Sequence, residues 1–374
     1  MASRLAPLAT AIALAACTEP LPSDPGASEA PSDLGGEHQG SPEDLGTTED
    51  LGRGVAPDSG VAPDPPFPVS LVDGEVSYRT NYPAGENVGR TIRVRLRYPN
   101  LPVGRPGGGL PVVLVSHGGS GSVRGHTTFE HVGVELAGQG YLAVHLNHPV
   151  SPSTINHRWD RPYDVSAVLD ALFSSELTLP PGVREGLDPE RVGHIGHSWG
   201  AYTAHALGGA TLDNPLPDGG ARWGFRDERI RAIVALSPQG FGQFGQFDAV
   251  ETLSQGSPDN SWRTVGVPSF ALIGALEMDG VAGVENPAVC PECFRVEGWR
   301  RFPFARYPAD GRRHLSVLAG QTHASMGNTG SAAVQRHIAV QARLFFDIYL
   351  RGMTGRIAEL EAPDPLVDRV YVRK

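Results

Sequence analysis

The pentapeptide Gly196-His197-Ser198-Trp199-Gly200 is the feature that most restricts how this chain can fold. It joins an apolar run at 191–195 to a run of small residues at 201–207 that favours a helix. A Gly-x-Ser-x-Gly motif between a strand and a helix is typical of a nucleophile elbow, a strained turn at the carboxyl end of a parallel strand. The glycines are needed because the two backbones pass too close for a Cβ atom. The motif therefore predicts that Ser198 is a nucleophile on a parallel sheet.

The apolar pattern alternates between strand and helix periods from residue 67 onward. Residues 91–98 alternate strictly, with arginines on one face, which predicts a half-buried antiparallel strand near a sheet edge. Residues 111–116 form a continuous apolar run, as in a parallel strand covered on both faces. The same criteria predict strands at 141–146, 191–195, 230–236, 269–273 and 314–318, and helices at 127–138, 164–173 and 331–350. This alternation predicts an α/β fold with a mainly parallel sheet, whose ligands bind at the carboxyl ends of the strands.

The first seventeen residues have the composition of an export signal. Arg4 precedes a short apolar stretch at 5–16, too short to span a bilayer, and Leu14-Ala15-Ala16-Cys17 follows. These four residues resemble the bacterial lipobox, which implies cleavage before Cys17 and lipidation of its thiol. The alternative is an ordinary signal peptide with an incidental cysteine. Thr18, in place of an aspartate, implies sorting to the outer membrane.

Residues 18–66 are expected to form a disordered tether before a catalytic domain at 67–374. The segment has nine prolines, no aromatic residue, eleven acidic residues and one arginine. It cannot bury enough apolar area to offset the entropy of ordering it. Its net charge of −10 equals the formal charge of the whole chain, so the acidic composition describes the tether and not the substrate. No basic cluster suggests a nucleic-acid partner.

A serine nucleophile needs a base, and an acid that orients the base. In the α/β-hydrolase fold, to which such an elbow and sheet belong, their order along the chain is Ser, Asp or Glu, His. His323 follows the strand at 314–318 and a glycine, and is preferred over His314 and His337. The loop after the strand at 269–273 offers Glu277 and Asp279, which cannot both point at one imidazole. Asp279 is preferred because it precedes a glycine where a turn can aim it, and Glu277 is expected to lie behind it or to face solvent.

The tetrahedral oxyanion needs backbone donors, which this fold takes from two places. One is the amide after the nucleophile, here Trp199. The other lies in the loop after an early strand, where Gly119 is preferred and Gly118 or Ser120 are alternatives. His197, Gly118 and Ser120 are expected to line the substrate pocket. His117 is expected to be structural.

No metal or cofactor is expected. His145, His148 and His157 lack the spacing of metal ligands. If Cys17 is lipidated, Cys290 and Cys293 remain outside the reducing cytosol, which favours a short disulfide between them. They lie in an insertion at about 281–313 that is either part of the cleft rim or an ordinary packed loop.

Several motifs occur together in one order and make the comparison more specific. They are Val-Ser-His-Gly at 115–118, Leu-Asn-His-Pro at 146–149, Arg-Pro-Tyr-Asp-Val at 161–165, the elbow, and the Gly-x-x-His loop at 320–323. Over about 90–350 the chain resembles the serine α/β-hydrolases grouped as predicted dienelactone hydrolases, related to platelet-activating-factor acetylhydrolases and cutinase-like polyester hydrolases. Ala-Leu-Glu-Met-Asp at 275–279 is similar to the acid loop of the polyester group, which supports Asp279. Two departures are Ser198, where true dienelactone hydrolase has cysteine, and Asn147, where an aspartate is expected.

The sequence thus predicts a lipid-anchored, extracytoplasmic serine hydrolase that cleaves a small-molecule, lipid or polymer ester through an acyl-enzyme. Only the lipid anchor would contact the membrane, and no oligomeric state is predicted. Two alternatives remain open. One is a peptidase, thioesterase or acyltransferase of the same fold, and the other is a non-catalytic lipoprotein that binds ligands at the surface.

Overall fold

The computed structural model describes residues 66–80, 88–100, 109–119, 122, 124–150, 154–212, 223–240, 260–277 and 298–374. All of them belong to one compact unit, residues 53–374. Five of the candidate site residues lie outside the described residues: Cys17, Ser120, Asp279, Cys290 and Cys293.

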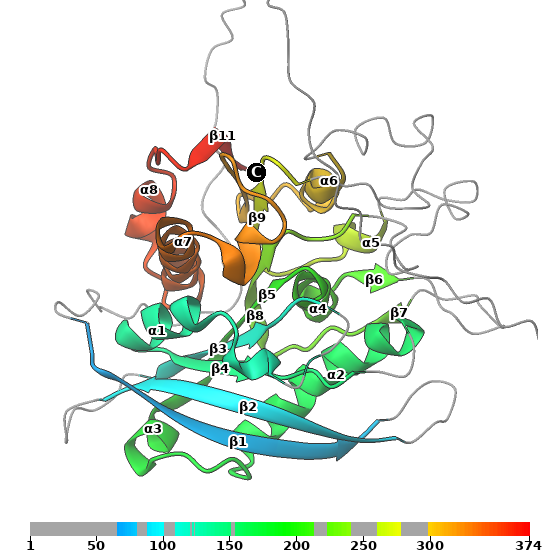
Figure 1. Ribbon diagram of the computed structural model, residues 1–374, viewed down its shortest axis with the longest axis vertical. Coiled ribbons are helices and arrows are strands. Elements are labelled where there is room, and N and C mark those ends of the chain that lie inside the picture. The colour runs from blue at the N-terminus through cyan, green and yellow to red at the C-terminus, as the bar shows by residue number, and fades with distance from the viewer. Residues whose placement is uncertain are drawn as a thin grey trace, which may run out of the picture. The chain divides into compact units, whose positions relative to one another are not determined.

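Within the described residues, nine strands form one mixed, mostly parallel sheet (Figure 1). Six consecutive strands in the middle, from β4 to β10, are parallel, and the antiparallel strands lie at the two edges. In spatial order the strands are β1 (Val69–Arg79), β2 (Gly89–Pro99), β4 (Leu142–Leu146), β3 (Leu110–Ser116), β5 (Leu187–His197), β8 (Ile230–Leu236), β9 (Ser269–Gly274), β10 (Arg313–Leu318) and β11 (Val367–Arg373).

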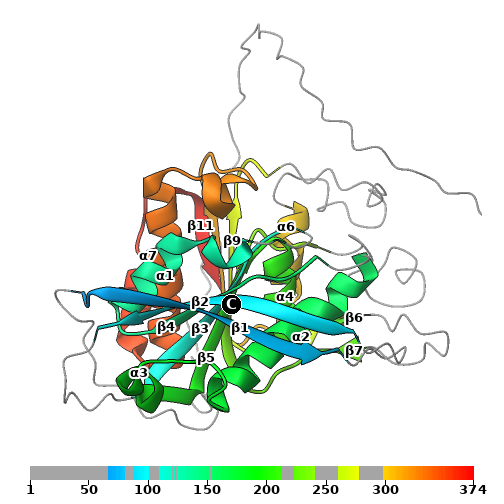
Figure 2. The same ribbon diagram turned by 60° about the horizontal axis from the view of Figure 1, so that its bottom comes forward.

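Helices cover both faces of the sheet. Figures 1 and 2 show α1 and α7 on one side and α2 and α4 on the other, and each pair packs on its own apolar cluster. This double cover explains why β3 is buried along its whole length. The helices are α1 (Glu130–Gly138), α2 (Thr154–Phe173), α3 (Pro181–Gly186), α4 (Trp199–Gly208), α5 (Asn260–Arg263), α6 (Gly298–Arg306), α7 (Ala332–Leu350) and α8 (Ile357–Leu360), with short turns η1 (Gly125–Thr127), η5 (Ser325–Thr329) and η6 (Thr354–Arg356). A separate pair of short strands joins β6 (Thr211–Leu212) to β7 (Trp223–Gly224).

The predicted α/β class and mainly parallel sheet are confirmed, and the predicted edge-proximal antiparallel strand is β2, next to the edge strand β1. One helix is longer than predicted. The sequence pattern starts it at 164, whereas α2 begins at Thr154 and contains Pro162. A proline leaves the carbonyl four residues earlier without its helical donor. Here the Tyr202 hydroxyl, from α4, donates to the Arg158 carbonyl over 2.9 Å and satisfies it.

Two strands of the large sheet have no counterpart in the predictions, and neither do the short strands β6 and β7. β1 and β11 each lie at a sheet edge, and β1 is half-buried to exposed along most of its length. Their apolar patterns are correspondingly weak. In the described part of the chain, no helix is both long and apolar enough to cross a bilayer.

Candidate functional site

Ser198 occupies a strained turn between β5 and α4. Its backbone has φ 55° and ψ −114°, a region that residues other than glycine rarely adopt. A Cβ atom on Gly196 would lie 2.2 Å from the Gly200 carbonyl oxygen, and one on Gly200 would lie 2.2 Å from the Ser116 carbonyl oxygen. Both positions therefore require glycine, as the motif predicts. The turn sets Ser198 at the carboxyl edge of the sheet, where its N–H donates to the carbonyl of Leu236 at the end of β8.

His323 lies at the same edge, in the loop that follows β10. Its Nδ1 atom is 3.2 Å from Oε2 of Glu277, at the end of β9. With a carboxylate at that distance Nδ1 carries the proton and donates it, which leaves Nε2 as the basic nitrogen. The imidazole is about one-third exposed, with 38% of the side chain accessible. The His323 ring lies against the ring of His197, the residue before Ser198, with the two centroids 4.6 Å apart.

Glu277 is fully buried and its carboxylate is held by several donors. Oε1 accepts hydrogen bonds from the Ser237 hydroxyl at 2.5 Å and the Gly274 N–H at 2.7 Å. Oε2 lies 2.9 Å from Nε of Arg300 and also faces His323. Burial by itself raises the pKa of Glu277, but the bond to His323, the charge of Arg300 and the bonds from Ser237 and Gly274 outweigh it. The net pKa lies below the ordinary 4.5, so the carboxylate is ionised at neutral pH.

Of the two positions expected for Glu277, behind Asp279 or facing solvent, the second is therefore wrong. The reason is a tight turn after β9, in which the Glu277 N–H reaches the Gly274 carbonyl and the Leu276 N–H donates to the Gln321 carbonyl at 2.8 Å. These bonds join the ends of β9 and β10 and fold Glu277 back towards the His323 loop. A Cβ atom on Gly274 would lie 2.2 Å from the Gln321 oxygen, so the approach depends on glycine. The preferred carboxylate, Asp279, lies outside the described residues.

The loop after β3 lies against Ser198. A Cβ atom on Gly118 would be 3.2 Å from the Cβ of Ser198, so Gly118 lies next to the Ser198 side chain. Gly119 is exposed and has φ +76°, the left-handed conformation that favours glycine. Trp199 begins α4 directly after Ser198, and the first amides of a helix have no acceptor within that helix. The backbone of two segments thus lies next to Ser198, and backbone N–H groups in such positions are suited to stabilising negative charge.

Two buried histidines hold the backbone of the loops around Ser198. His197 is buried, and its Nε2 donates to the backbone oxygen of His323 over 2.9 Å. Burial lowers the pKa of His197 to about 3, so the ring is neutral. It braces the His323 loop from inside the protein, whereas the sequence placed it in the wall of the substrate pocket. His117 is also buried; its Nδ1 donates to the Gly118 carbonyl at 2.7 Å and its Nε2 accepts from the His148 N–H at 3.0 Å. This matches the structural role expected for it.

A second set of hydrogen-bonded Ser, His and Asp side chains is buried next to the loop after β3. Ser116 Oγ is 2.8 Å from His148 Nε2, and His148 Nδ1 is 2.9 Å from Asp164. Ser116 also contacts His194 at 2.9 Å, and Arg90 makes an ion pair with Asp164 at 2.8 Å. None of these side chains is accessible enough for a substrate to reach. The set is therefore part of the support of the site and not a second reactive centre.

Sequence reasoning missed three polar residues around the site. Arg300 contacts Glu277, Arg161 donates to the loop after β3, and Gln239 places Nε2 3.5 Å from Ser198 Oγ. The one sequence signal was the Arg-Pro-Tyr-Asp-Val motif, which contains Arg161. Asn147, which stands where an aspartate was expected, accepts a hydrogen bond from the Gly125 N–H at 2.8 Å.

The described residues include no group of three or more His, Cys, Asp or Glu side chains that could hold a metal. Of the three histidines considered from sequence, His145 bonds to the Thr128 carbonyl and His148 to Asp164, while the side chain of His157 is not described.

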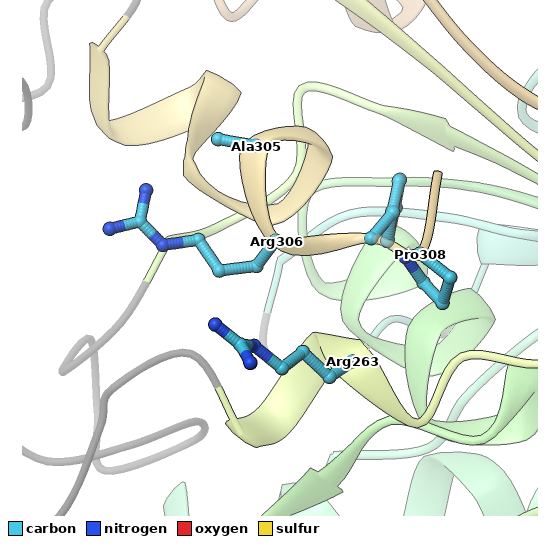
Figure 3. Close-up of a pocket in the computed structure, with 5 residues that line it drawn as sticks. Arg263, Ala305, Arg306 and Pro308 are labelled. Carbon is cyan, nitrogen blue, oxygen red and sulfur yellow. The ribbon is translucent and has the colours of Figure 1, made fainter. Parts of the chain in front are cut away.

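Two cavities lie away from Ser198. One, of about 470 Å³, is shown in Figure 3, where Arg263 and Arg306 extend their guanidinium groups to the same side. Its other lining residues are Ala305, Tyr307 and Pro308. These residues and Arg263 precede β9 and β10 in the chain, so the cavity lies near the amino ends of these strands, whereas Ser198 lies at the carboxyl ends. The other, of about 510 Å³, lies beside α8 and β11. Neither is lined by Ser198, Glu277 or His323.

No family model matches the chain, and a search of curated proteins gave no match.

Proposed function

We propose that this chain has the α/β-hydrolase fold and is a serine-dependent carboxylic ester hydrolase. The observation that carries the proposal is Ser198 in a strained turn, φ 55°, at the sheet edge where His323 contacts a buried carboxylate. The strain is informative because such a conformation persists only where the surrounding structure enforces it, and it clusters at reactive sites. The substrate would be an ester of a small molecule, a lipid or a polymer.

In the acylation half-reaction, Ser198 Oγ attacks the ester carbonyl carbon while Nε2 of His323 takes the hydroxyl proton. The carbonyl π electrons move onto oxygen, and the backbone N–H groups of Trp199 and of Gly119 or Gly118 stabilise that oxyanion. The intermediate then collapses, the bond to the alcohol oxygen breaks, and the imidazolium gives its proton to the leaving alkoxide. The products of this half are the free alcohol and an acyl-Ser198 ester.

In the deacylation half-reaction, water replaces the alcohol. His323 removes a proton from the water, whose oxygen attacks the acyl carbon and forms a second tetrahedral oxyanion. Collapse breaks the bond to Ser198 Oγ, which recovers its proton from His323, and the carboxylic acid leaves. Atoms and protons balance without a metal or cofactor.

We assign Glu277 as the orienting acid because its carboxylate contacts His323. Its ionised carboxylate would accept the Nδ1 proton, keep the imidazole in the tautomer whose Nε2 is basic, and stabilise the imidazolium that forms. Asp279, which the sequence favours, is the alternative. Because one imidazole accepts only one such partner, substitutions at the two positions distinguish them.

The test uses the full chain in detergent with p-nitrophenyl esters of increasing acyl length. We expect turnover in the native protein, none above background in Ser198→Ala, and full activity in the control Ser77→Ala, an exposed serine on β1. A fluorophosphonate should add once, at Ser198, as read by intact mass and peptide mapping. A folded protein that neither turns over esters nor takes the label would refute the proposal and leave the binding-lipoprotein alternative.

Parallel assays separate the related activities. Thioester and amide analogues report thioesterase and peptidase activity, and an added acceptor alcohol reports acyl transfer. If an amide or thioester is cleaved with a kcat/KM above that of the matched ester, or transfer exceeds hydrolysis, the reaction class is that one instead.

We further propose that Cys17 carries a lipid that anchors the enzyme outside the cytoplasm, at the outer membrane. The support for this proposal is the Leu-Ala-Ala-Cys motif in the sequence. Residues 1–65 lie outside the described part of the chain. Cys17→Ala should move the protein from the membrane fraction to the soluble fraction, and should abolish incorporation of labelled palmitate. An Ala variant that stays in the membrane fraction would contradict lipid anchoring.

A further inference from the structure

We propose that Arg161 is a positioning residue that holds the loop after β3 in the conformation that presents its backbone amides for oxyanion stabilisation. The inference rests on the proposed function, because it assigns a role within the same site.

Arg161 lies on α2 and is fully buried. Its guanidinium donates from Nη1 to the His117 carbonyl at 2.9 Å and from Nη2 to the Gly119 carbonyl at 2.7 Å. The Nε atom has no hydrogen-bond partner in the described structure. One planar group therefore spans two carbonyls that are two residues apart along the loop, a geometry that suits the fixed fork of arginine.

The direction of these carbonyls decides the direction of the neighbouring amides. In a trans peptide the C=O of one residue and the N–H of the next point in opposite directions. Because Arg161 draws the His117 carbonyl towards α2, the Gly118 N–H must point away from α2. The His117 ring holds the Gly118 carbonyl at 2.7 Å in the same manner, which directs the Gly119 N–H. Both candidate donors are thus set by bonds to the carbonyl on the other side of the peptide plane.

The loop needs such a clamp because of its composition. Gly118 and Gly119 carry no Cβ atom, so their peptide planes are not restrained by side-chain sterics. Gly118 cannot be exchanged for a stiffer residue, since a Cβ atom there would be 2.9 Å from His197 Nδ1 and 3.2 Å from Ser198 Cβ. The close approach to Ser198 requires glycine, and the glycine in turn requires an external clamp.

Burying a guanidinium is costly unless hydrogen bonds and nearby opposite charges offset the loss of hydration. Burial lowers the pKa of Arg161 to about 9, with nearby Asp164 opposing the shift, so the group remains protonated at neutral pH. Asp164 is itself engaged by Arg90, at 2.8 Å, and by His148. Arg161 therefore adds positive potential behind the loop in addition to its hydrogen bonds, and both effects favour a developing oxyanion.

The test compares Arg161→Met with Arg161→Lys in the full chain, with kcat expressed per site titrated by fluorophosphonate at end point. Loss of one oxyanion donor lowers kcat by about 10²–10³, and we expect a loss of that size in Arg161→Met, with KM changed by less than about threefold. Affinity for a trifluoromethyl ketone, which adds to the serine and forms an oxyanion, should fall by the same factor. Arg161→Lys retains a charge but cannot span both carbonyls, so it should restore at most part of the loss.

Arg313→Met is the matched control. Arg313 is also a buried arginine that donates to two backbone carbonyls, those of Val265 and Val267, but at the amino end of β10. The Arg313→Met variant should have a lower melting temperature and an unchanged kcat per titrated site. If Arg161→Met behaves in the same way, with kcat within about threefold of the native value, the inference is refuted although the hydrolase assignment stands. Should the methionine variant not fold, an unchanged kcat in Arg161→Lys is the refuting result. A native protein without turnover or labelling refutes both.

Discussion

Replacing Glu277 by glutamine tests the geometry of the site most directly. The native carboxylate has four acceptor contacts: Ser237 Oγ and the Gly274 N–H on Oε1, His323 Nδ1 and Arg300 Nε on Oε2. An amide has one oxygen and one NH₂ group, and the NH₂ group accepts no hydrogen bond. With NH₂ in the place of Oε2 it faces the Arg300 donor. With NH₂ in the place of Oε1 it faces the Gly274 N–H. Each orientation therefore places the NH₂ group against one donor that cannot become an acceptor.

The expected effect on catalysis is about 10⁴ in kcat, or about 5 kcal/mol of transition-state stabilisation. In the first orientation the amide donates to Nδ1, which moves the proton of His323 to Nε2 and removes the base that Ser198 needs. The variant also removes the ion pair between Glu277 and Arg300, and breaking a buried pair of this kind costs about 3–5 kcal/mol of stability. Activity must therefore be expressed per folded site.

The assay measures kcat for a p-nitrophenyl ester per site titrated by fluorophosphonate, with circular dichroism to verify folding. Asp279→Asn is the paired variant, and we expect it to lose less than about tenfold. If Glu277→Gln keeps kcat within about tenfold of the native value while Asp279→Asn loses about 10⁴, the acid is Asp279. In that case the reasoning from the contact between Glu277 and His323 fails.

Three further outcomes are expected. Gly200→Ala places a Cβ atom 2.2 Å from the Ser116 carbonyl oxygen, so it should lower both the melting temperature and kcat. The control is Gly182→Ala, whose Cβ atom meets nothing within 4 Å and which should lower neither. Equal melting temperatures in the two variants would contradict the close approach of β3 and α4. Deleting residues 18–66 should leave kcat/KM for a small ester unchanged, because the sequence predicts no catalytic or core residue there. Loss of activity in a folded truncated protein would show that the segment takes part. Lowering the pH from 7.5 to 5.5 should reduce the free energy of unfolding, because histidines of the unfolded chain bind protons near their ordinary pKa of 6.5 while the buried histidines of the folded chain do not. Each such histidine should lower the free energy of unfolding by up to about 1.4 kcal/mol per pH unit. Thermal melts across that range check this, and a constant melting temperature would contradict the buried neutral state of the histidines whose pKa burial lowers to about 3, which are His145, His194, His197, His205 and His314.

Local patterns in the sequence were sufficient for the framework. The continuous apolar run at 111–116 predicted the buried parallel strand β3, and the strict alternation at 91–98 predicted the antiparallel strand β2. The glycines of the elbow predicted the tight crossing of β5 and α4 at Ser198. Each of these depends on the spacing of a few consecutive residues, because strand burial and tight turns place their requirements on immediate neighbours.

The remaining features were decided by contacts between distant parts of the chain. α2 extends back to Thr154 through a proline because a tyrosine 44 residues away from Arg158 satisfies the freed carbonyl. The inward orientation of Glu277 could not be predicted from its loop alone, since Glu277 is turned inward by the end of β10 and by Arg300 of α6. Arg161 was part of a motif, yet its bonds to the loop after β3 cross 42 and 44 positions of sequence. Periodicity and motif spacing determine which residues can lie at the carboxyl edge of the sheet, whereas the direction of each side chain there depends on packing partners that only the folded chain brings together.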